Sequence, residues 1–209
     1  FLFDWKWVFI KVGEKMDDLF ANVRENARKK AAPLAARMRP ATLDEYVGQD
    51  HIIGPGKLLR RAIEADRLTS VIFYAPPGTG KTTLAQLISK NTQSDFKQLS
   101  AVTAGVTDIR EIIKNAKENV ELYGRKTVLF IDEIHRFNKG QQDALLPAVE
   151  EGLVVLVGAT TENPYFEVNA ALLSRSRVFK LESLTVEDIK QIMSNALNNV
   201  EKGLGDYRV

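Results

Sequence analysis

A glycine-rich turn between an apolar run and a helical run constrains the fold of this chain more than any other feature. The residues from Ser70 to Ala75 read SVIFYA, the turn reads PPGTG, and the next run begins KTTLAQLIS. A short buried strand that leads through such a turn into a helix is the first half of a β–α–β unit. The sequence therefore predicts a parallel sheet with helices on its faces.

Short apolar runs and helical patterns alternate along the rest of the chain. Expected strands are 71–75, 96–100, 127–131, 153–159 and 178–181. Expected helices are 57–65, 81–93, 108–121, 141–150, 170–173 and one from Thr185 towards Val200; a shorter one should open at the capping box of Thr42 and Glu45. This pattern predicts an α/β fold with a three-layer, parallel, five-stranded nucleotide-binding sheet.

Changes in residue pattern along the chain also indicate domain boundaries. We expect a leader or an artefact of expression over 1–15, with a genuine amphipathic arm as the alternative, and a basic arm over 16–40 that contains a short helical pattern at 19–23. The nucleotide-binding core should cover 41–183, and 184–209 should be a further helical segment. The chain is expected to be truncated there, because one trailing helix has no partner for Ile189, Ile192 and Leu197.

The composition says little about the binding partners and the cellular location of the protein. The formal charge of the 209 residues is only +2, although 24–39 hold six Lys/Arg against one acid. This local basicity favours a solvated arm over a segment that contacts DNA or a protein. There is no cysteine and no run long enough to span a bilayer, so we expect a cytoplasmic protein with no membrane partner.

The turn has the spacing of a phosphate-binding loop. Backbone N–H groups and the following helix N-terminus can cradle a polyphosphate, and Gly78 and Gly80 allow its close approach. Lys81 would reach the β- and γ-phosphates of a nucleotide such as ATP, while the Thr82 hydroxyl would bind Mg2+. Ala75 replaces the usual first glycine at a strand end where φ should be negative, so the site should tolerate it. The expected nucleotide-binding residues of the loop are Ala75, Pro76, Pro77, Gly78, Thr79, Gly80, Lys81, Thr82 and Thr83.

Two adjacent acids end the apolar run VLFI about fifty residues further on. Asp132 is expected to hold magnesium through its water shell, and Glu133 to polarise the attacking water. The later run VVLVGATT would bring hydroxyls to the same edge of the sheet. Thr161 or Asn163 would there sense the γ-phosphate or position the water. Together these residues predict nucleotide hydrolysis.

Two arginines stand between a short helical run and the last expected strand, in LLSRSR. Arg175 or Arg177 in this position would project into the nucleotide of a neighbouring subunit and stabilise the charge of the transition state. Surface ion pairing is the alternative for either side chain.

The strings PPGTGKT, LFIDE, GATTENP and LLSRSR, in this order, resemble those of an AAA+ ATPase. More particular strings are AVTAGVTDIREII, DEIHRFNKGQQDALLPAVEEG and GATTENPYFEVNAALLSRSRVF. They resemble the replication-associated recombination protein A family, which has eukaryotic relatives that interact with the Werner helicase. The resemblance covers nearly all of the chain from Pro33, and it makes the segment 184–209 the start of a helical lid.

This resemblance implies roles for individual residues. Glu133 would be the hydrolytic base, Thr161 the first sensor and Arg175 the arginine acting in trans. The segment before the first strand would wrap the adenine through Tyr46, Val47, Gly48, Ile52 and Ile53. The family's second sensor arginine and its C-terminal oligomerisation region have no counterpart in these residues, so the chain is expected to hydrolyse ATP weakly.

The resemblance also implies partners. The chain would form a homo-oligomer with further copies of itself, expected to be a tetramer. Its other partners would be DNA at stalled forks, gaps and ends, and single-strand-binding protein, and its location would be a bacterial nucleoid. Arg110, Lys114 and Lys139 are candidates for DNA-backbone contacts, with solvated surface charge as the alternative. His135, beside the acids, is expected to be a structural hydrogen-bonding residue rather than a metal ligand.

Other readings remain open on the sequence alone. A Holliday-junction motor of the RuvB type shares the DEIHR string, although FNKGQQD and TENP favour the first family. A clamp-loader subunit fits less well, because nothing resembles its zinc module. From a different functional class, the chain would be a nucleotide-gated switch that recruits partners with little turnover.

Overall fold

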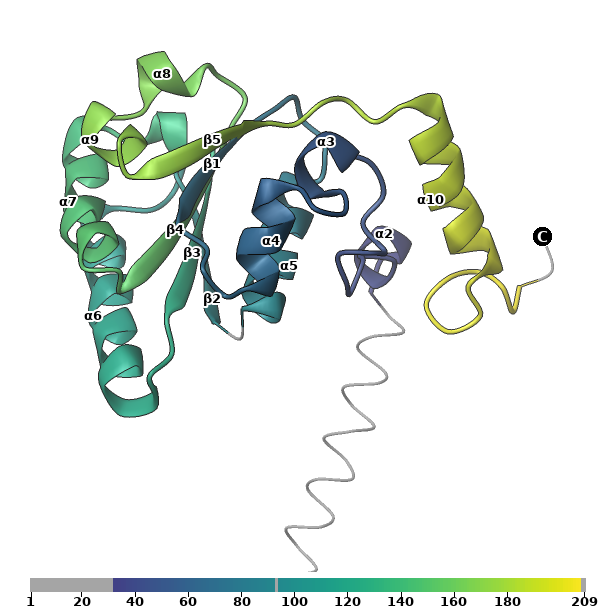
Figure 1. The fold of residues 1–209 in the computed structure, drawn as a ribbon, viewed down its shortest axis with the longest axis horizontal. Coiled ribbons are helices and arrows are strands. Elements are labelled where there is room, and N and C mark those ends of the chain that lie inside the picture. The colour runs from purple at the N-terminus through teal and green to yellow at the C-terminus, as the bar shows by residue number, and fades with distance from the viewer. Residues whose placement is uncertain (1–31, 93, 208–209) are drawn as a thin grey trace, which may run out of the picture. The chain divides into compact units, whose positions relative to one another are not determined.

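A computed structural model describes residues 32–92 and 94–207 (Figure 1). Its sheet has the strand order β2-β3-β4-β1-β5, and each pair of neighbouring strands is parallel. The strands are β1 (Ser70–Tyr74), β2 (Asp95–Ser100), β3 (Thr127–Asp132), β4 (Val154–Thr160) and β5 (Ser176–Lys180). The five-stranded parallel α/β sheet expected from the sequence is thereby confirmed.

Helices precede, separate and follow the strands along the chain. They are α2 (Leu34–Arg37), α3 (Asp50–Ile53), α4 (Leu58–Glu64), α5 (Lys81–Asn91), α6 (Val106–Tyr123), the 3-10 turn η1 (Ile134–Arg136), α7 (Lys139–Glu150), α8 (Pro164–Glu167), α9 (Ala170–Leu173) and α10 (Val186–Asn198). Among the described residues, no helix is long and apolar enough to cross a membrane.

The core consists of two apolar layers, one on each face of the sheet. Successive residues of a strand point to opposite faces, so Val71 and Phe73 pack in the layer with α4 and α5, whereas Ile72 packs in the layer with α6 and α7. Figure 1 shows the two pairs of helices on opposite sides of the sheet. Burial of both faces explains why the central strands are continuous apolar runs.

The expected elements differ from the observed ones mainly at their ends. Residues 42–45 form bends and turns rather than a helix: the Thr42 hydroxyl accepts from the Glu45 N–H as in a capping box, but the Glu45 carboxylate accepts from the Ala41 N–H instead of that of Thr42. Helix α6 begins two residues earlier than expected, because Asp108 lies in its first turn and accepts from the Gly105 N–H at 2.7 Å. The short elements α2, α3, η1 and α8 were not expected. The helical pattern at 19–23 lies outside the described residues.

The segment before β1 is tied to the end of the sheet by one side chain. The Gln49 amide donates to the Glu182 carbonyl at 2.7 Å and accepts from the Glu182 N–H at 2.9 Å. Gln49 is only 6% exposed and has a positive φ of 64°, so a buried amide holds a backbone conformation that costs free energy. Both residues belong to the compact unit Pro40–Ile189. The described residues outside it fall in a second unit, and the boundaries expected at 40/41 and 183/184 stay predictions.

Replacing Gln49 with Ala should lower the free energy of unfolding by about 2 kcal/mol, because both hydrogen bonds are lost and two backbone groups of Glu182 lose their partner. Urea denaturation followed by circular dichroism measures this change. The matched control is Gln98→Ala on the exposed face of β2, which should change stability by less than about 0.5 kcal/mol. Equal effects of the two substitutions on the free energy of unfolding would contradict a stabilising role for the hydrogen bonds of Gln49.

Candidate nucleotide-binding and hydrolysis site

The carboxyl ends of three adjacent strands bring the polar motifs together. Strand β4 lies between β3 and β1, and the Ala75 N–H donates to the Thr160 carbonyl at 3.0 Å just beyond the β1–β4 ladder. After β1 the polypeptide turns to one face of the sheet, towards α5, and after β4 it turns to the other face, towards α9. In open α/β sheets, ligands bind in the crevice at such a point.

The phosphate loop joins β1 to α5 and has the backbone that its glycines predict. Gly78 and Gly80 have φ values of 79° and 91°, in the region that side chains rarely adopt. Ala75 is not among the described residues with positive φ, as expected. A Cβ built at Gly78 would meet nothing within 4 Å, so the loop faces open space on that side. Its backbone can therefore approach a phosphate closely.

Lys81 lies in the first turn of α5, and its side chain folds over the loop. Its Nζ donates to the carbonyls of Ala75 and Pro76, each at 2.9 Å. Burial lowers the pKa of the Lys81 ammonium, and the carboxylates of Asp132 and Glu133 act in the opposite direction. A buried ammonium so close to two carboxylates is suited to bind the negative charge of a polyphosphate.

Tyr46 contacts the backbone of the phosphate loop. Its buried hydroxyl donates to the carbonyls of Thr79 and Gly80, at 3.3 and 3.4 Å. Burial raises the pKa of the Tyr46 phenol, so the hydroxyl keeps its proton at neutral pH. A Cβ built at Gly80 would lie 2.5 Å from the Tyr46 oxygen, so Gly80 is required by this contact as well as by its φ.

The other residues expected to wrap the adenine differ in exposure. Ile52 and Ile53 are 6% and 2% exposed and belong to the α4/α5 layer of the core. Val47 and Gly48 are partly exposed, and Gly48 has a φ of 80° and lies against Leu184. The structure thus gives Val47 and Gly48 more access to a ligand than the two isoleucines, and the adenine contacts stay a prediction.

Thr82 and Asp132 provide oxygen atoms of the kind that Mg2+ prefers. Among the described residues, the Thr82 hydroxyl has no hydrogen-bond partner, and no cluster of three or more His, Asp or Glu side chains could hold a metal by itself. A magnesium ion bound through a nucleotide needs only one or two protein oxygens. The residues present therefore fit Mg2+ bound together with a nucleotide.

Glu133 follows β3 with a positive φ of 56°, which places its carboxylate beside η1. Its Oε2 lies 3.3 Å from His135 Nε2 and 3.6 Å from Arg136 Nε. The neighbouring strand contributes the hydroxyl of Thr160, which is fully buried and lies 3.0 Å from His135 Nδ1. Neither Thr160 nor a link through His135 was expected from the sequence.

The two expected sensors at the end of β4 have different surroundings. Thr161 is partly exposed, and its hydroxyl has no partner among the described residues. Asn163 caps α8, where its Oδ1 accepts from the Tyr165 N–H at 3.1 Å. Thr161 therefore remains the expected sensor, whereas Asn163 has a structural role at the start of a helix.

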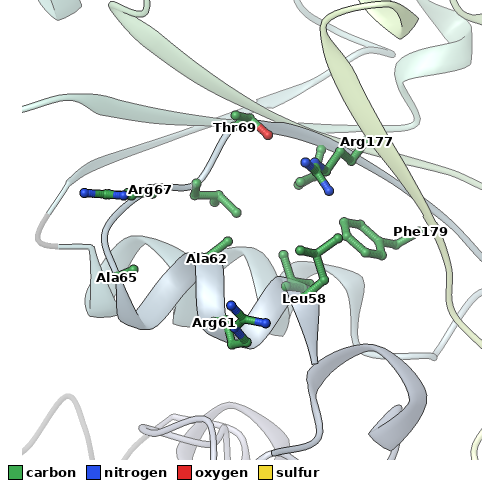
Figure 2. A pocket seen from close by; sticks show the side chains of 11 residues that line it. Leu58, Arg61, Ala62, Ala65, Arg67, Thr69, Arg177 and Phe179 are labelled. Carbon is green, nitrogen blue, oxygen red and sulfur yellow. The ribbon is translucent and has the colours of Figure 1, made fainter. Parts of the chain in front are cut away.

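The two arginines of LLSRSR lie in different surroundings. Arg175 precedes β5 and pairs with Glu150 Oε1 at 2.6 Å, with its side chain 41% exposed. Arg177 points into a cavity of about 340 Å3 between α4 and β5, where Figure 2 shows it beside Phe179. Thr69, which immediately precedes β1, also lines this cavity. The cavity therefore lies at the amino end of β1, at the edge of the sheet opposite the phosphate loop.

Comparisons with known proteins agree with this geometry. A family model described as the Holliday junction DNA helicase RuvB P-loop domain matches residues 38–173. The replication-associated recombination protein A of Haemophilus influenzae is 54% identical over 183 residues, which are 88% of this chain and 41% of that protein. The protein of the same name from Escherichia coli K12 is 55% identical over 173 residues, 83% of this chain and 38% of that protein.

The chain belongs to this P-loop family. Over most of its length it is similar to proteins named replication-associated recombination protein A. The resemblance noted in the sequence is thereby confirmed. The ATPase WRNIP1 of Dictyostelium discoideum is 48% identical over 82% of this chain and 20% of that protein. The chain thus spans about two fifths or less of these curated relatives.

Solved structures give the same fold. The Thermotoga maritima RuvB Holliday junction branch migration motor superposes with a TM-score of 0.63 and 34% identity, over 78% of this chain and 54% of that one. The fold of this chain is therefore that of an AAA+ P-loop domain.

The two loop glycines should respond differently to a methyl group. Gly80→Ala should lower the free energy of unfolding by about 2 kcal/mol or more, because strain at positive φ adds to the clash with Tyr46. Gly78→Ala should cost only about 1 kcal/mol, since its Cβ meets open space. Thermal and urea unfolding of both variants measure the order, and an equal or reversed cost would refute the Tyr46 contact.

Proposed function

We propose that this chain is an ATP-hydrolysing AAA+ domain that works on DNA in replication-associated recombination. The observation that carries the proposal is the meeting of the phosphate loop with Asp132 and Glu133 at one edge of the sheet. Its support is the 54–55% identity to proteins named for replication-associated recombination, against 34% to the RuvB motor. Forks, gaps and DNA ends are the proposed substrates.

Each side chain of the site has a proposed task. The loop N–H groups and Lys81 bind the phosphates, while Thr82 and Asp132 hold Mg2+, which neutralises charge on the phosphate oxygens when bound. Glu133 accepts a proton from the attacking water, and Thr161 orients that water or senses the γ-phosphate. The partial exposure of Thr161, just after β4, and the contact of the Glu133 carboxylate with His135 are consistent with these roles.

The proposed assembly is a homo-oligomer, with a tetramer as the expected size, in the bacterial cytoplasm at the nucleoid. Single-strand-binding protein is a proposed partner. Arg110, Lys114 and Lys139 are exposed and would contact the DNA backbone, so binding should weaken strongly with salt and show little base preference.

RuvB-type branch migration is a second candidate, because the family model and the solved structures both carry that name. A four-way junction that stimulated turnover more than a gapped duplex would favour it. A nucleotide-gated switch would instead bind ATP with slow turnover and no response to DNA.

Glu133→Gln should keep ATP affinity within about threefold and lower the hydrolysis rate at least about 100-fold, because an amide cannot take a proton from water. Steady-state hydrolysis is measured with no DNA, gapped duplex, blunt duplex and a four-way junction. For the unaltered chain, gapped or blunt DNA should raise the rate, and added salt should remove the increase.

Two outcomes of this experiment contradict the proposal. Unchanged hydrolysis in Glu133→Gln would remove the glutamate from its role. A rate that no DNA alters would favour the switch.

Arg175→Ala should keep ATP affinity and lose hydrolysis, because its proposed target lies in a neighbouring subunit. The exposed pair with Glu150 is worth about 0.5 kcal/mol, so it does not prevent the arginine from exchanging partners. Mixing Arg175→Ala with Lys81→Met, each inactive alone, should restore hydrolysis, since one variant supplies the arginine and the other an intact phosphate loop.

The same mixture with Arg177→Ala in place of Arg175→Ala tests which arginine acts. Rescue by that mixture only would transfer the role to Arg177. Absence of rescue in both would contradict an arginine acting in trans.

A further inference from the structure

His135 joins the proposed base to the neighbouring strand. Its Nε2 lies 3.3 Å from Glu133 Oε2, and its Nδ1 lies 3.0 Å from the Thr160 hydroxyl. The side chains of His135 and Glu133 are 12% and 28% exposed, and Thr160 is fully buried. Each ring nitrogen therefore lies next to a polar group of the protein, and Glu133 is still partly open to water.

The hydroxyl of Thr160 determines which ring nitrogen carries the proton. It accepts from the Glu162 N–H at 3.0 Å and has a single proton to donate, with His135 Nδ1 at 3.0 Å and the Glu162 carbonyl at 3.2 Å as possible acceptors. Donation to Nδ1 leaves the proton of a neutral ring on Nε2, the nitrogen that lies 3.3 Å from Glu133 Oε2. The opposite choice gives Nδ1 the proton, and a neutral ring then has none for Glu133.

The turn that carries His135 is held firmly against β4. Ile134 is fully buried, and a Cβ built at Gly158 would lie 3.1 Å from its Cδ1, so the turn packs where β4 has no side chain. Phe137, 3% exposed, anchors the other end of the turn. The distance from Thr160 to Glu133 is therefore fixed by packing on both sides of the histidine.

Only one oxygen of the Glu133 carboxylate is engaged. His135 and Arg136 both approach Oε2, and Oε1 has no partner among the described residues. A carboxylate anchored through one oxygen can present the other, in a fixed orientation, to a water molecule. Orientation of a base by a third group is the usual arrangement in sites that activate a nucleophile.

We propose that His135 is a positioning residue that orients Glu133 according to the conformation of the loop after β4. The path runs from the Glu162 N–H through the Thr160 hydroxyl and the His135 ring to Glu133 Oε2. Because Thr161 lies within this loop, a change in the sensor is passed to the base. The inference rests on the proposed role of Glu133 in ATP hydrolysis.

The first test compares variants of the chain in steady-state ATP hydrolysis. His135→Ala should lower kcat about 10- to 100-fold and change KM for ATP less than about threefold, because orientation of the base is lost while the phosphate loop is untouched. His135→Gln can place an amide N–H near Nε2 and should retain kcat within about fivefold. His51→Ala is the matched control, since the chain's other histidine contacts only the Lys180 carbonyl in the described structure.

Thr160→Val removes the hydroxyl at nearly constant shape and should lower kcat as His135→Ala does. The double variant should be no slower than His135→Ala alone, because both changes break the same path. Additive losses, or equal kcat for His135→Ala and the unaltered chain while Glu133→Gln is inactive, would overturn the inference and leave the proposed function standing. Full activity of Glu133→Gln would instead remove the proposed function.

A second measurement does not depend on turnover. Nitrogen-15 NMR of the imidazole rings, at a pH where a free imidazole is neutral, should show His135 with its proton on Nε2. Thr160→Val should shift the His135 ring signals and leave those of His51 unchanged. A ring with its proton on Nδ1, or one indifferent to Thr160, would refute the path even if no condition gave hydrolysis.

Discussion

The hydrogen bond from the Ala75 N–H to the Thr160 carbonyl extends the pairing of β1 with β4 to the edge of the sheet. Neighbouring strands lie about 4.8 Å apart, so this bond sets the distance between the phosphate loop and the end of β4. Strand β3 pairs with β4 on the other side, which places Asp132 and Glu133 by the same means. The proposed chemistry thus depends on a central strand that carries no charged residue.

The sheet could be predicted because its central strands are buried on both faces. Continuous apolar runs such as VVLVGA have no other stable location in a chain of this size, and their ends lay within two residues of those expected. The short helix expected to open at Thr42 does not form, and the reason is not local. One of the two capping hydrogen bonds forms, but the chain then turns so that Tyr46 reaches the phosphate loop, and this tertiary contact overrides the helical start.

The site divides in the same way. Each motif follows the carboxyl end of a strand, so Lys81, Asp132 and Glu133 could be placed together once a parallel sheet was expected. The partnership of Thr160 with His135 could not, because it depends on which hydroxyl of β4 faces η1 and on a short turn with no periodic signal. The contact of Tyr46 with Thr79 spans 33 positions and likewise leaves no local trace.

The bare backbone at Gly158 gives this architecture an unusual weakness. A methyl group there would meet Ile134 at 3.1 and 3.4 Å, and the displacement would travel through the turn to the carboxylate without touching any polar atom. Inactivating substitutions in such a domain need not fall on residues that would touch the nucleotide. The interior of β4 would then tolerate substitution as poorly as the glycine-rich loop, although Gly158 itself takes no part in the proposed chemistry.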